Sequence, residues 1–319
     1  MKILITGIRG FVGTHLAEFL LDKKDVQIHG IARGAGEKRR RSKTAGKVFI
    51  HNCDLRDASS VDRILKKVRP DWVFHLAAQS FVPRSWENPA QTLTNNTIGQ
   101  LNLLESLKTL KIRPRVHIAG SSEEYGKVDP SEIPMKETNP LRPLSPYGVS
   151  KVTQDLLAYQ YYQSFHMDLV RTRAFSHTGP GQTDVFVASN FAKQIARIEA
   201  GKQSAVIHVG NLEAVRDFTD VRDMVRAYWL ALEKGKAGEV YNICSEAGHP
   251  IKEIVAIYLK ACALRVKVKE DPSRIRPSDV PILVGDGRKF FKQTGWTPRI
   301  LFKETLLDLL NYWRKKIGS

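Results

Sequence analysis

Residues 2–20 read KILITGIRGFVGTHLAEFL, an apolar run followed by three glycines and an amphipathic stretch. The run 2–6 is typical of a strand, and 11–23 carries apolar residues at helical spacing. Glycine allows a tight turn between the two, and the helix N-terminus offers unpaired N–H groups to a pyrophosphate. Three glycines occur in many loops, but their place between a strand and a helix indicates a dinucleotide site. The expected cofactor contacts here are Gly7, Gly10, Phe11, Val12 and Gly13.

Short apolar runs continue to alternate with longer amphipathic stretches up to about residue 175. Runs that predict further strands lie at 26–32, 47–52, 72–78, 115–121 and 168–175. Helical patterns separate most of them, at 57–68, 90–109 and 146–165. Repeated alternation of strand and helix predicts an α/β fold, a Rossmann-type doubly wound parallel sheet, over residues 1–175.

After residue 175 the alternation of strand-like and helix-like stretches becomes less regular. A Gly/Pro turn, HTGPGQ, is followed by short apolar runs such as 239–244 and by helical patterns at 187–200, 221–234, 250–263 and 302–315. We expect 176–319 to form a smaller, mostly C-terminal α/β lobe that binds substrate. No clean linker separates the two parts, so segments from about 209–245 are expected to return to the first domain.

Composition and charge limit the classes of function. The 319 residues carry 50 Lys and Arg against 33 Asp and Glu, a formal net charge of +17. Basic and aromatic residues are not interleaved as in single-strand binders, so we expect an anionic small ligand and no nucleic acid. Apolar runs fall short of the roughly 20 residues of a membrane span, and no signal peptide is evident. Three distant cysteines suggest neither disulfides nor a metal site, so a cytoplasmic protein is predicted.

The end of the second predicted strand bears on the choice of cofactor. An acidic residue commonly holds the ribose 2′-hydroxyl of NAD at this place. This chain has Arg33 instead, and the basic run EKRRRSK (37–43) follows. A guanidinium suits a 2′-phosphate, so NADP(H) is the preferred cofactor. NAD(H) is the alternative, because Arg33 could also lie over the adenine ring.

Further cofactor contacts are expected where the third and fourth strands end. Asp54 is placed to accept a hydrogen bond from the adenine amino group. Small residues after the fourth strand would let the backbone lie against the cofactor. The candidates are Asp54, Leu55, Leu76, Ala77 and Ala78.

Tyr147 and Lys151 lie four residues apart in SPYGVSK (145–151), and therefore share one face of a helix. An ammonium near a phenol, together with a nicotinamide cation, lowers the pKa of the tyrosine. The phenol can then exchange a proton with a sugar oxygen that Ser121, at a strand end, polarises. Each signal is weak alone, but the glycine-rich turn, the serine and the YxxxK helix in this order predict an NAD(P)-dependent oxidoreductase. A non-enzymatic cofactor-binding scaffold would commonly lack the tyrosine or the lysine, and His177 is interpreted as structural.

From end to end the chain resembles the extended short-chain dehydrogenase/reductases that modify nucleotide sugars. The likeness is carried by GSSEEYG (120–126), LRPLSPYGVSK (141–151), HTGPGQ (177–182) and VGNLEAVRDFTDVRD (209–223). It implies a catalytic triad of Ser121, Tyr147 and Lys151, the last two also contacting the cofactor, and a GDP-sugar in a cleft between two lobes. A homodimer formed through the predicted helices 90–109 and 146–165 is also implied.

The resemblance also suggests which residues hold the substrate. Arg216 and Arg276 match positions that bind diphosphate or nucleoside, and Asp279 matches one that binds ribose hydroxyls. Ser176 stands where the family usually has asparagine, so its reach is shorter. The candidate substrate residues are Ser176, Lys193, Arg216, Arg276 and Asp279.

The stretch AGSSEEYG (119–126) bears on which reaction is catalysed. A GDP-mannose 4,6-dehydratase needs an additional acid/base carboxylate, which the resemblance places at Glu123. Dehydratases read Thr-Ser-Glu-Leu-Tyr-Gly here, whereas this chain has the Ser-Ser-Glu-Glu-Tyr-Gly of 4-keto reductases. The resemblance therefore implies NAD(P)H-dependent reduction of the 4-keto group of GDP-4-keto-6-deoxy-D-mannose to GDP-D-rhamnose, with hydride to C4 and a proton from Tyr147. The dehydratase, or another nucleotide-sugar epimerase or reductase, is the alternative, and Glu124 is assigned to solvent or to a structural pair.

Overall fold

The computed structural model describes residues 1–34, 48–274 and 280–318, and its main sheet has seven strands. They run in the order β10-β6-β5-β4-β1-β2-β3, and every neighbouring pair is parallel. The strands are β1 (Lys2–Thr6), β2 (Gln27–Ala32), β3 (Val48–Asn52), β4 (Trp72–His75), β5 (Arg115–Ser121), β6 (Leu169–Ala174) and β10 (Val240–Ile243). This is the order of a Rossmann-type doubly wound sheet, so the predicted fold class is confirmed.

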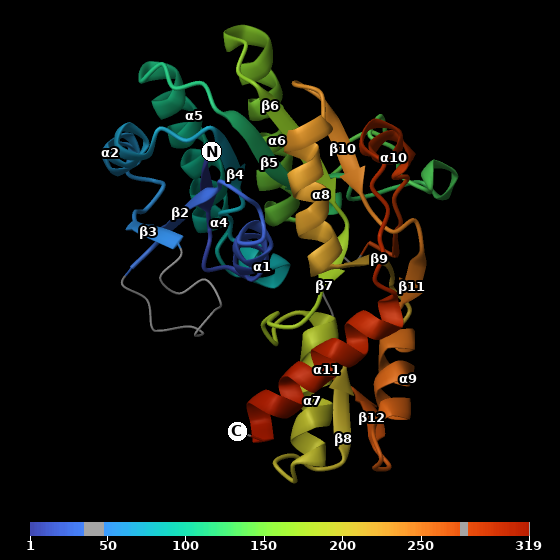
Figure 1. Cartoon of the computed structure of the whole chain (residues 1–319). Coiled ribbons are helices and arrows are strands. Elements are labelled where there is room, and N and C mark those ends of the chain that lie inside the picture. The colour runs from blue at the N-terminus through green and yellow to red at the C-terminus, as the bar shows by residue number, and fades with distance from the viewer. Residues whose placement is uncertain (35–47, 275–279, 319) are drawn as a thin grey trace.

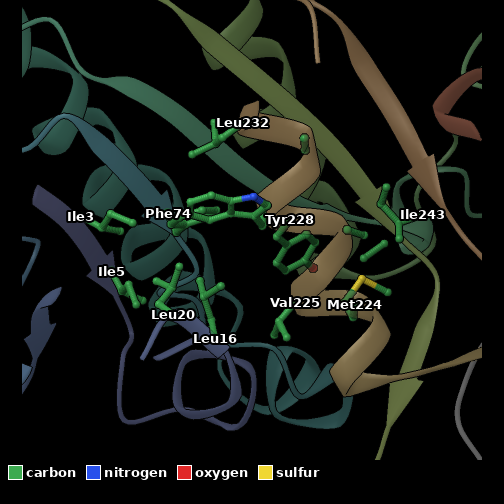
Figure 2. Close-up of a cluster of buried hydrophobic side chains, with 14 of the residues drawn as sticks. Ile3, Ile5, Leu16, Leu20, Phe74, Met224, Val225, Tyr228, Leu232 and Ile243 are labelled. Carbon is green, nitrogen blue, oxygen red and sulfur yellow. The ribbon is translucent and has the colours of Figure 1, made fainter. Parts of the chain in front are cut away.

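Helices cover both faces of this sheet (Figure 1). One face carries α1 (Phe11–Leu20), α8 (Val221–Lys234) and α10 (Arg288–Thr294), and the other carries α2 (Ala58–Val68), α5 (Gly99–Thr109) and α6 (Pro146–Phe165). Figure 2 shows Met224, Tyr228 and Leu232 of α8 among the side chains that pack against the strands. A helix far along the chain therefore completes the core that β1 and α1 begin.

The remaining elements form a smaller group below the main sheet (Figure 1). Its helices are α7 (Val187–Glu199), α9 (Ile251–Ala261) and α11 (Phe302–Gly318), which share a hydrophobic core of their own. A two-stranded sheet joins β8 (Val206–Val209) to β12 (Lys267–Glu270). A second sheet is built on β9 (Val215–Asp220), which pairs with β7 (Ser176–Thr178), β11 (Gly248–Pro250) and β13 (Ile282–Leu283).

The helix predicted over 90–109 is interrupted in the structure. This stretch contains α4 (Pro89–Leu93), a π-helical turn η1 (Thr94–Ile98) and α5, and it is preceded by the short helix α3 (Val82–Glu87). In the π turn, Asn96 is fully buried, and its side chain bonds Gln79 N at 2.7 Å and Ser150 Oγ at 2.9 Å. Periodicity could not show this break, because the residues around it keep helical spacing while the Asn96 side chain is drawn into a polar contact.

The described part of the chain also has three short 3-10 turns, at η2 (Ser122–Glu124), η3 (Pro130–Glu132) and η4 (Pro272–Arg274). Within the described ranges, no helix is long and apolar enough to span a membrane, and no cluster of side chains could hold a metal ion. Cys53, Cys244 and Cys262 are free and buried. The basic run 37–43 lies outside the described residues, as do Arg276 and Asp279.

Candidate active site

A cleft of about 940 Å³ opens at the carboxyl ends of the main strands, where α/β sheets commonly bind ligands. On one side it is lined by the glycine-rich turn after β1 and by the residues that follow β4 and β5. On the other side it is lined by the segments around β7, the start of α7 and β9. Ser121, Tyr147 and Lys151 all lie in this cleft, which brings the predicted triad together with the predicted cofactor turn.

The glycine-rich turn fits a pyrophosphate. Gly7 adopts a left-handed backbone (φ +73°), and a Cβ on Gly13 would lie 2.3 Å from the Gly7 carbonyl oxygen. These two glycines therefore allow the helix to begin close against the strand. The first helical hydrogen bond runs from Thr14 N to Gly10 O at 3.0 Å. The amides of residues 11–13 precede it and can bind an anion at the mouth of the cleft.

Of the other predicted cofactor residues, some line the cleft, and the rest lie near the ends of β2 and β3. Leu76, Ala77 and Ala78 line the cleft, and the Thr6 hydroxyl accepts hydrogen bonds from the amides of the first two at 3.1 Å. This contact ends β4 at His75, three residues before the predicted strand end. Arg33 is exposed just after β2.

At the end of β3 the carboxylate of Asp54 is held by a neighbour. The Arg56 guanidinium donates to both of its oxygens, at distances of 2.5–3.0 Å. This hydrogen bonding lowers the pKa of Asp54. Leu55 lies in the hydrophobic core of the α2 and α5 face. Contacts from Arg33, Asp54 and Leu55 to a cofactor stay predictions.

The turn after β5 presents Ser121 to the cleft. Its hydroxyl oxygen accepts the Glu123 N–H at 3.2 Å and so begins the 3-10 turn, while Glu124 closes the capping box from the other side. Ser121 also hydrogen-bonds the Tyr147 phenol, which lowers the pKa of that tyrosine. Serine and tyrosine are therefore within reach of one substrate oxygen.

Tyr147 and Lys151 share the inner face of α6, and both are more than nine-tenths buried. Burial is the main influence on the phenol and raises its pKa, and nearby Glu123 and Glu124 raise it further. This is opposite to the direction expected from Lys151, whose ammonium lies 6.0 Å from the centre of the ring, because burial has the larger effect on the pKa. At neutral pH the tyrosine is consequently a protonated acid, the form that reduction of a carbonyl requires.

The Lys151 ammonium is held by two acceptors, the Ala119 carbonyl at 2.7 Å and Gln154 Oε1 at 2.9 Å. Burial lowers the pKa of this lysine, and the negative charge of Glu124 raises it. Gln154 is fixed in turn, because its amide donates to the Asn96 carbonyl at 2.9 Å. The π turn thus holds Gln154, and Gln154 holds the lysine. No periodic pattern in the sequence indicated this role.

The two glutamates at the end of β5 have different environments. Glu123 lines the cleft, as its candidate role requires. Glu124 is fully buried and forms an ion pair with Arg173, with Arg173 Nε 3.0 Å from its Oε2. Of the two assignments considered for Glu124, solvent is therefore wrong and a structural pair is confirmed.

The structure places only some of the predicted substrate residues in the cleft. Ser176 and Arg216 line the cleft. Lys193 does not appear among the described residues of the lining; it pairs with Asp184 at 2.6 Å and lies over the ring of Trp313. A contact between Lys193 and the substrate stays a prediction.

Several lining residues were missed by the sequence analysis. Phe81 and Phe186 face each other across the cleft, with ring centroids 5.9 Å apart. His177, which the sequence analysis interpreted as structural, also lines the cleft. It stacks on Phe11, and its Nδ1 lies 3.0 Å from the Phe175 carbonyl. No local motif marks such aromatic residues, since Phe81 and Phe186 lie just before α3 and α7 and are brought together only by the fold.

Comparison with known proteins extends these observations. The model of the GDP-mannose 4,6 dehydratase family matches residues 4–309. A GDP-6-deoxy-D-mannose reductase of Pseudomonas aeruginosa is 32% identical over 316 residues, covering 99% of this chain and 98% of that protein. A GDP-mannose 4,6-dehydratase of Vibrio cholerae is 32% identical over 348 residues, covering 97% and 92%.

Solved structures agree with the sequence relatives. The structure of RMD from Pseudomonas aeruginosa complexed with NADPH superposes with a TM-score of 0.86 at 31% identity, covering 99% of each chain. A UDP-glucose 4-epimerase of Thermus thermophilus in complex with NAD gives 0.87 at 29% identity, covering 98% and 99%. Both nicotinamide cofactors thus occur among the structural neighbours.

Fold, glycine-rich turn and serine–tyrosine–lysine cleft define an NAD(P)-dependent oxidoreductase of the extended short-chain dehydrogenase/reductase class. Likeness to the reductase and to the dehydratases extends over nearly the whole chain. The chain belongs to the GDP-mannose 4,6 dehydratase family.

Proposed function

We propose that this chain reduces the 4-keto group of GDP-4-keto-6-deoxy-D-mannose to GDP-D-rhamnose, with NADPH as the preferred cofactor. The observation that carries the proposal is the buried Tyr147 beside Ser121 in the cleft. The full-length similarity to a GDP-6-deoxy-D-mannose reductase supports it. Residues 1–175, with segments that return from 209–245, are proposed to bind the cofactor, and the rest to bind the sugar nucleotide.

Each residue of the triad has a distinct task in this reaction. When bound, NADPH supplies the hydride that reduces C4. Ser121 donates a hydrogen bond to the 4-keto oxygen and polarises it, and Tyr147 delivers the proton that this oxygen gains. Lys151, held by Ala119 and Gln154, keeps a positive charge near the phenol and so stabilises the phenolate left behind. Arg216, which is nine-tenths buried in the cleft wall, is proposed to bind the diphosphate.

The alternative function is that of a GDP-mannose 4,6-dehydratase. Its supporting observation is Glu123, a carboxylate that lines the same cleft as Tyr147. In the reductase that we propose, Glu123 instead hydrogen-bonds a sugar hydroxyl.

An assay with two substrates separates these functions. The protein is mixed with GDP-4-keto-6-deoxymannose and NADPH, and the absorbance of the reduced cofactor is followed. We expect stoichiometric oxidation of NADPH and no conversion of GDP-mannose in the absence of a reductant. Conversion of GDP-mannose without oxidation of NADPH in the first reaction would identify the dehydratase instead.

Arg33 is proposed to bind the 2′-phosphate of NADP(H). Its exposed position just after β2 supports this role, because the ribose of a dinucleotide lies there in such folds. We expect Arg33→Ala to weaken NADPH binding about tenfold to a hundredfold, since a charge-assisted hydrogen bond is worth about 1.5–3 kcal/mol. Fluorescence titration measures the change, and NADH is the internal control because it has no 2′-phosphate. Equal losses for the two cofactors would assign Arg33 to the adenine ring.

We also propose that the protein is a homodimer formed through α6 and α4. Large apolar side chains stay exposed along one stripe of α6: Val149, Leu156 and Tyr159 are 42–53% exposed. Leu93 of the neighbouring α4 adds to this surface. A contiguous apolar surface of this kind is typical of an interface with a second copy.

Light scattering tests this interface. We expect Leu156→Glu to convert a dimer to a monomer, because two buried carboxylates would face each other across the two-fold axis. Leu301, 73% exposed and ahead of α11, is the matched control, and Leu301→Glu should leave the dimer intact. A Leu156→Glu protein that keeps the mass of the wild type would disprove the proposed interface.

The proposed cytoplasmic location rests on the three cysteines, which are all free and buried. Structural disulfides are rare in reducing compartments, and buried thiols are inert there. The cysteines are consistent with that compartment.

A further inference from the structure

Glu124 is a buried acidic side chain that the proposed reaction does not use directly. Its side chain is completely buried at the end of the strand that bears Ser121. Oε1 accepts the Ser121 N–H at 2.7 Å, and Oε2 accepts Arg173 Nε at 3.0 Å. A buried carboxylate costs several kcal/mol unless it is paired, so both contacts are needed to hold it there.

Arg173 cannot easily move away from this carboxylate. Its guanidinium also donates to Asp155 at 2.5 and 3.0 Å, to the Tyr125 hydroxyl at 3.2 Å and to the Glu137 carbonyl at 3.0 Å. Asp155 is fixed further by Arg171 at 2.6 Å. The pair Glu124–Arg173 is therefore embedded in a polar network between α6, β5 and β6, which restrains its geometry.

The fit of Glu124 against the strand is tight. A Cβ on Gly120 would lie 2.4 Å from Glu124 Oε1 and 2.6 Å from the Thr172 carbonyl oxygen. Only glycine at this position lets the carboxylate reach the Ser121 amide. The carboxylate thus fixes both ends of the turn that holds the Ser121 hydroxyl and the Glu123 side chain in the cleft.

Burial and the nearby Asp155 raise the pKa of Glu124, and the charge of Arg173 lowers it. When it is ionised, the same carboxylate acts on the other two members of the triad through its charge. It raises the pKa of Lys151 and so opposes the loss of the proton that burial favours. It also raises the pKa of Tyr147. One side chain outside the cleft therefore contacts the backbone of the serine and influences the lysine and the tyrosine.

We propose, as an extension of the proposed function, that Glu124 is a positioning residue for the triad: anchored by Arg173, it fixes the turn that presents Ser121. Glu124 is not among the described residues that line the cleft. This explains why two adjacent glutamates follow β5, with Glu123 facing the ligand and Glu124 facing the interior.

The test compares Glu124→Gln with a matched glutamate elsewhere. The amide can still accept the Ser121 N–H, but it turns an NH₂ group toward Arg173 and removes the charge. We expect kcat to fall about tenfold to a hundredfold, with KM for the sugar nucleotide and Kd for NADPH within about threefold of the wild type. Glu132 closes a second capping box, with Asp129, and pairs with Arg142 at 2.8 Å outside the cleft. We expect kcat of Glu132→Gln to change by less than about twofold.

A double variant separates positioning from stability. Glu124→Leu with Arg173→Leu replaces the ion pair with apolar side chains, an exchange that is often neutral for stability. We expect this protein to melt near the wild type but to keep the low kcat. Recovery of kcat together with the melting temperature, or wild-type kcat in Glu124→Gln, would overturn the proposal. If the double variant does not fold, Glu124→Gln alone decides.

The two proposals fail in different ways. A wild type that converts GDP-mannose instead of the keto sugar disproves the proposed function, and the same variants are then compared in that reaction, which also uses the triad. A wild type inactive in both reactions overturns both proposals. An active wild type whose kcat is matched by Glu124→Gln overturns only the role of Glu124.

Discussion

Replacing Tyr147 with phenylalanine is expected to lower kcat about a thousandfold, the size of effect typical of a lost general acid. Phenylalanine fills the same buried space, so the fold should persist, but it cannot give a proton to the 4-keto oxygen. Because the hydroxyl acts mainly in the transition state, KM for the sugar nucleotide should change by less than about threefold. Steady-state kinetics with GDP-4-keto-6-deoxymannose and NADPH measure both quantities.

Tyr162, a second tyrosine of α6, provides the control for this variant. It is not among the described residues that line the cleft. Tyr162→Phe should therefore keep kcat within about twofold of the wild type. A Tyr147→Phe protein that retains more than about a tenth of the wild-type kcat would show that another group supplies the proton.

Replacing Gly13 with alanine is expected to have the next largest effect, on cofactor binding. The added Cβ would meet three backbone atoms, at 2.3 Å from Gly7 O, 2.8 Å from Ile8 Cα and 3.0 Å from Gly7 C. Backbone cannot rotate away as a side chain can, so the turn must open. Overpacking of this kind costs about 1–3 kcal/mol. If the strain falls on the turn, NADPH binding weakens by up to about a hundredfold.

Gly10→Ala separates this strain from the mere addition of a methyl group. Gly10 has an ordinary φ of −72°, and its Cβ would come only within 3.1 Å of Gly7 O. We expect the melting temperature of the cofactor-free Gly10→Ala protein to stay near the wild type, and that of Gly13→Ala to fall. Equal melting temperatures and equal NADPH affinities for Gly13→Ala and the wild type would refute the tight turn.

The main sheet could be predicted because its signals are local. Each strand is a short apolar run, and the helix that follows keeps its own period, so 2–6, 115–121 and 146–165 were placed within a residue of their observed ends. The smaller group of elements is different. Strands such as β7, β11 and β13 have two or three residues, too few to show an alternating pattern, and pairing with β9 rather than propensity makes them strands.

The candidate site was likewise predictable where a motif carries the chemistry. The glycine-rich turn, Ser121 and the Tyr147–Lys151 helix lie together in the cleft as expected. What sequence could not reveal is the support behind them: the Asn96–Gln154 contact that holds Lys151 and the Arg173 pair that buries Glu124. These contacts join segments 49 to 58 residues apart, and no spacing rule connects such positions.

The fate of the hydride tests the central claim most directly. NADPH carrying deuterium in the transferable position of the nicotinamide is incubated with the protein and GDP-4-keto-6-deoxymannose, and the product is examined by proton NMR. We predict a single deuterium at C4 of the sugar, with the configuration of rhamnose. Oxidised cofactor without deuterium at C4, or a sugar left as the 4-keto form, would contradict the assignment of this chain as a 4-keto reductase.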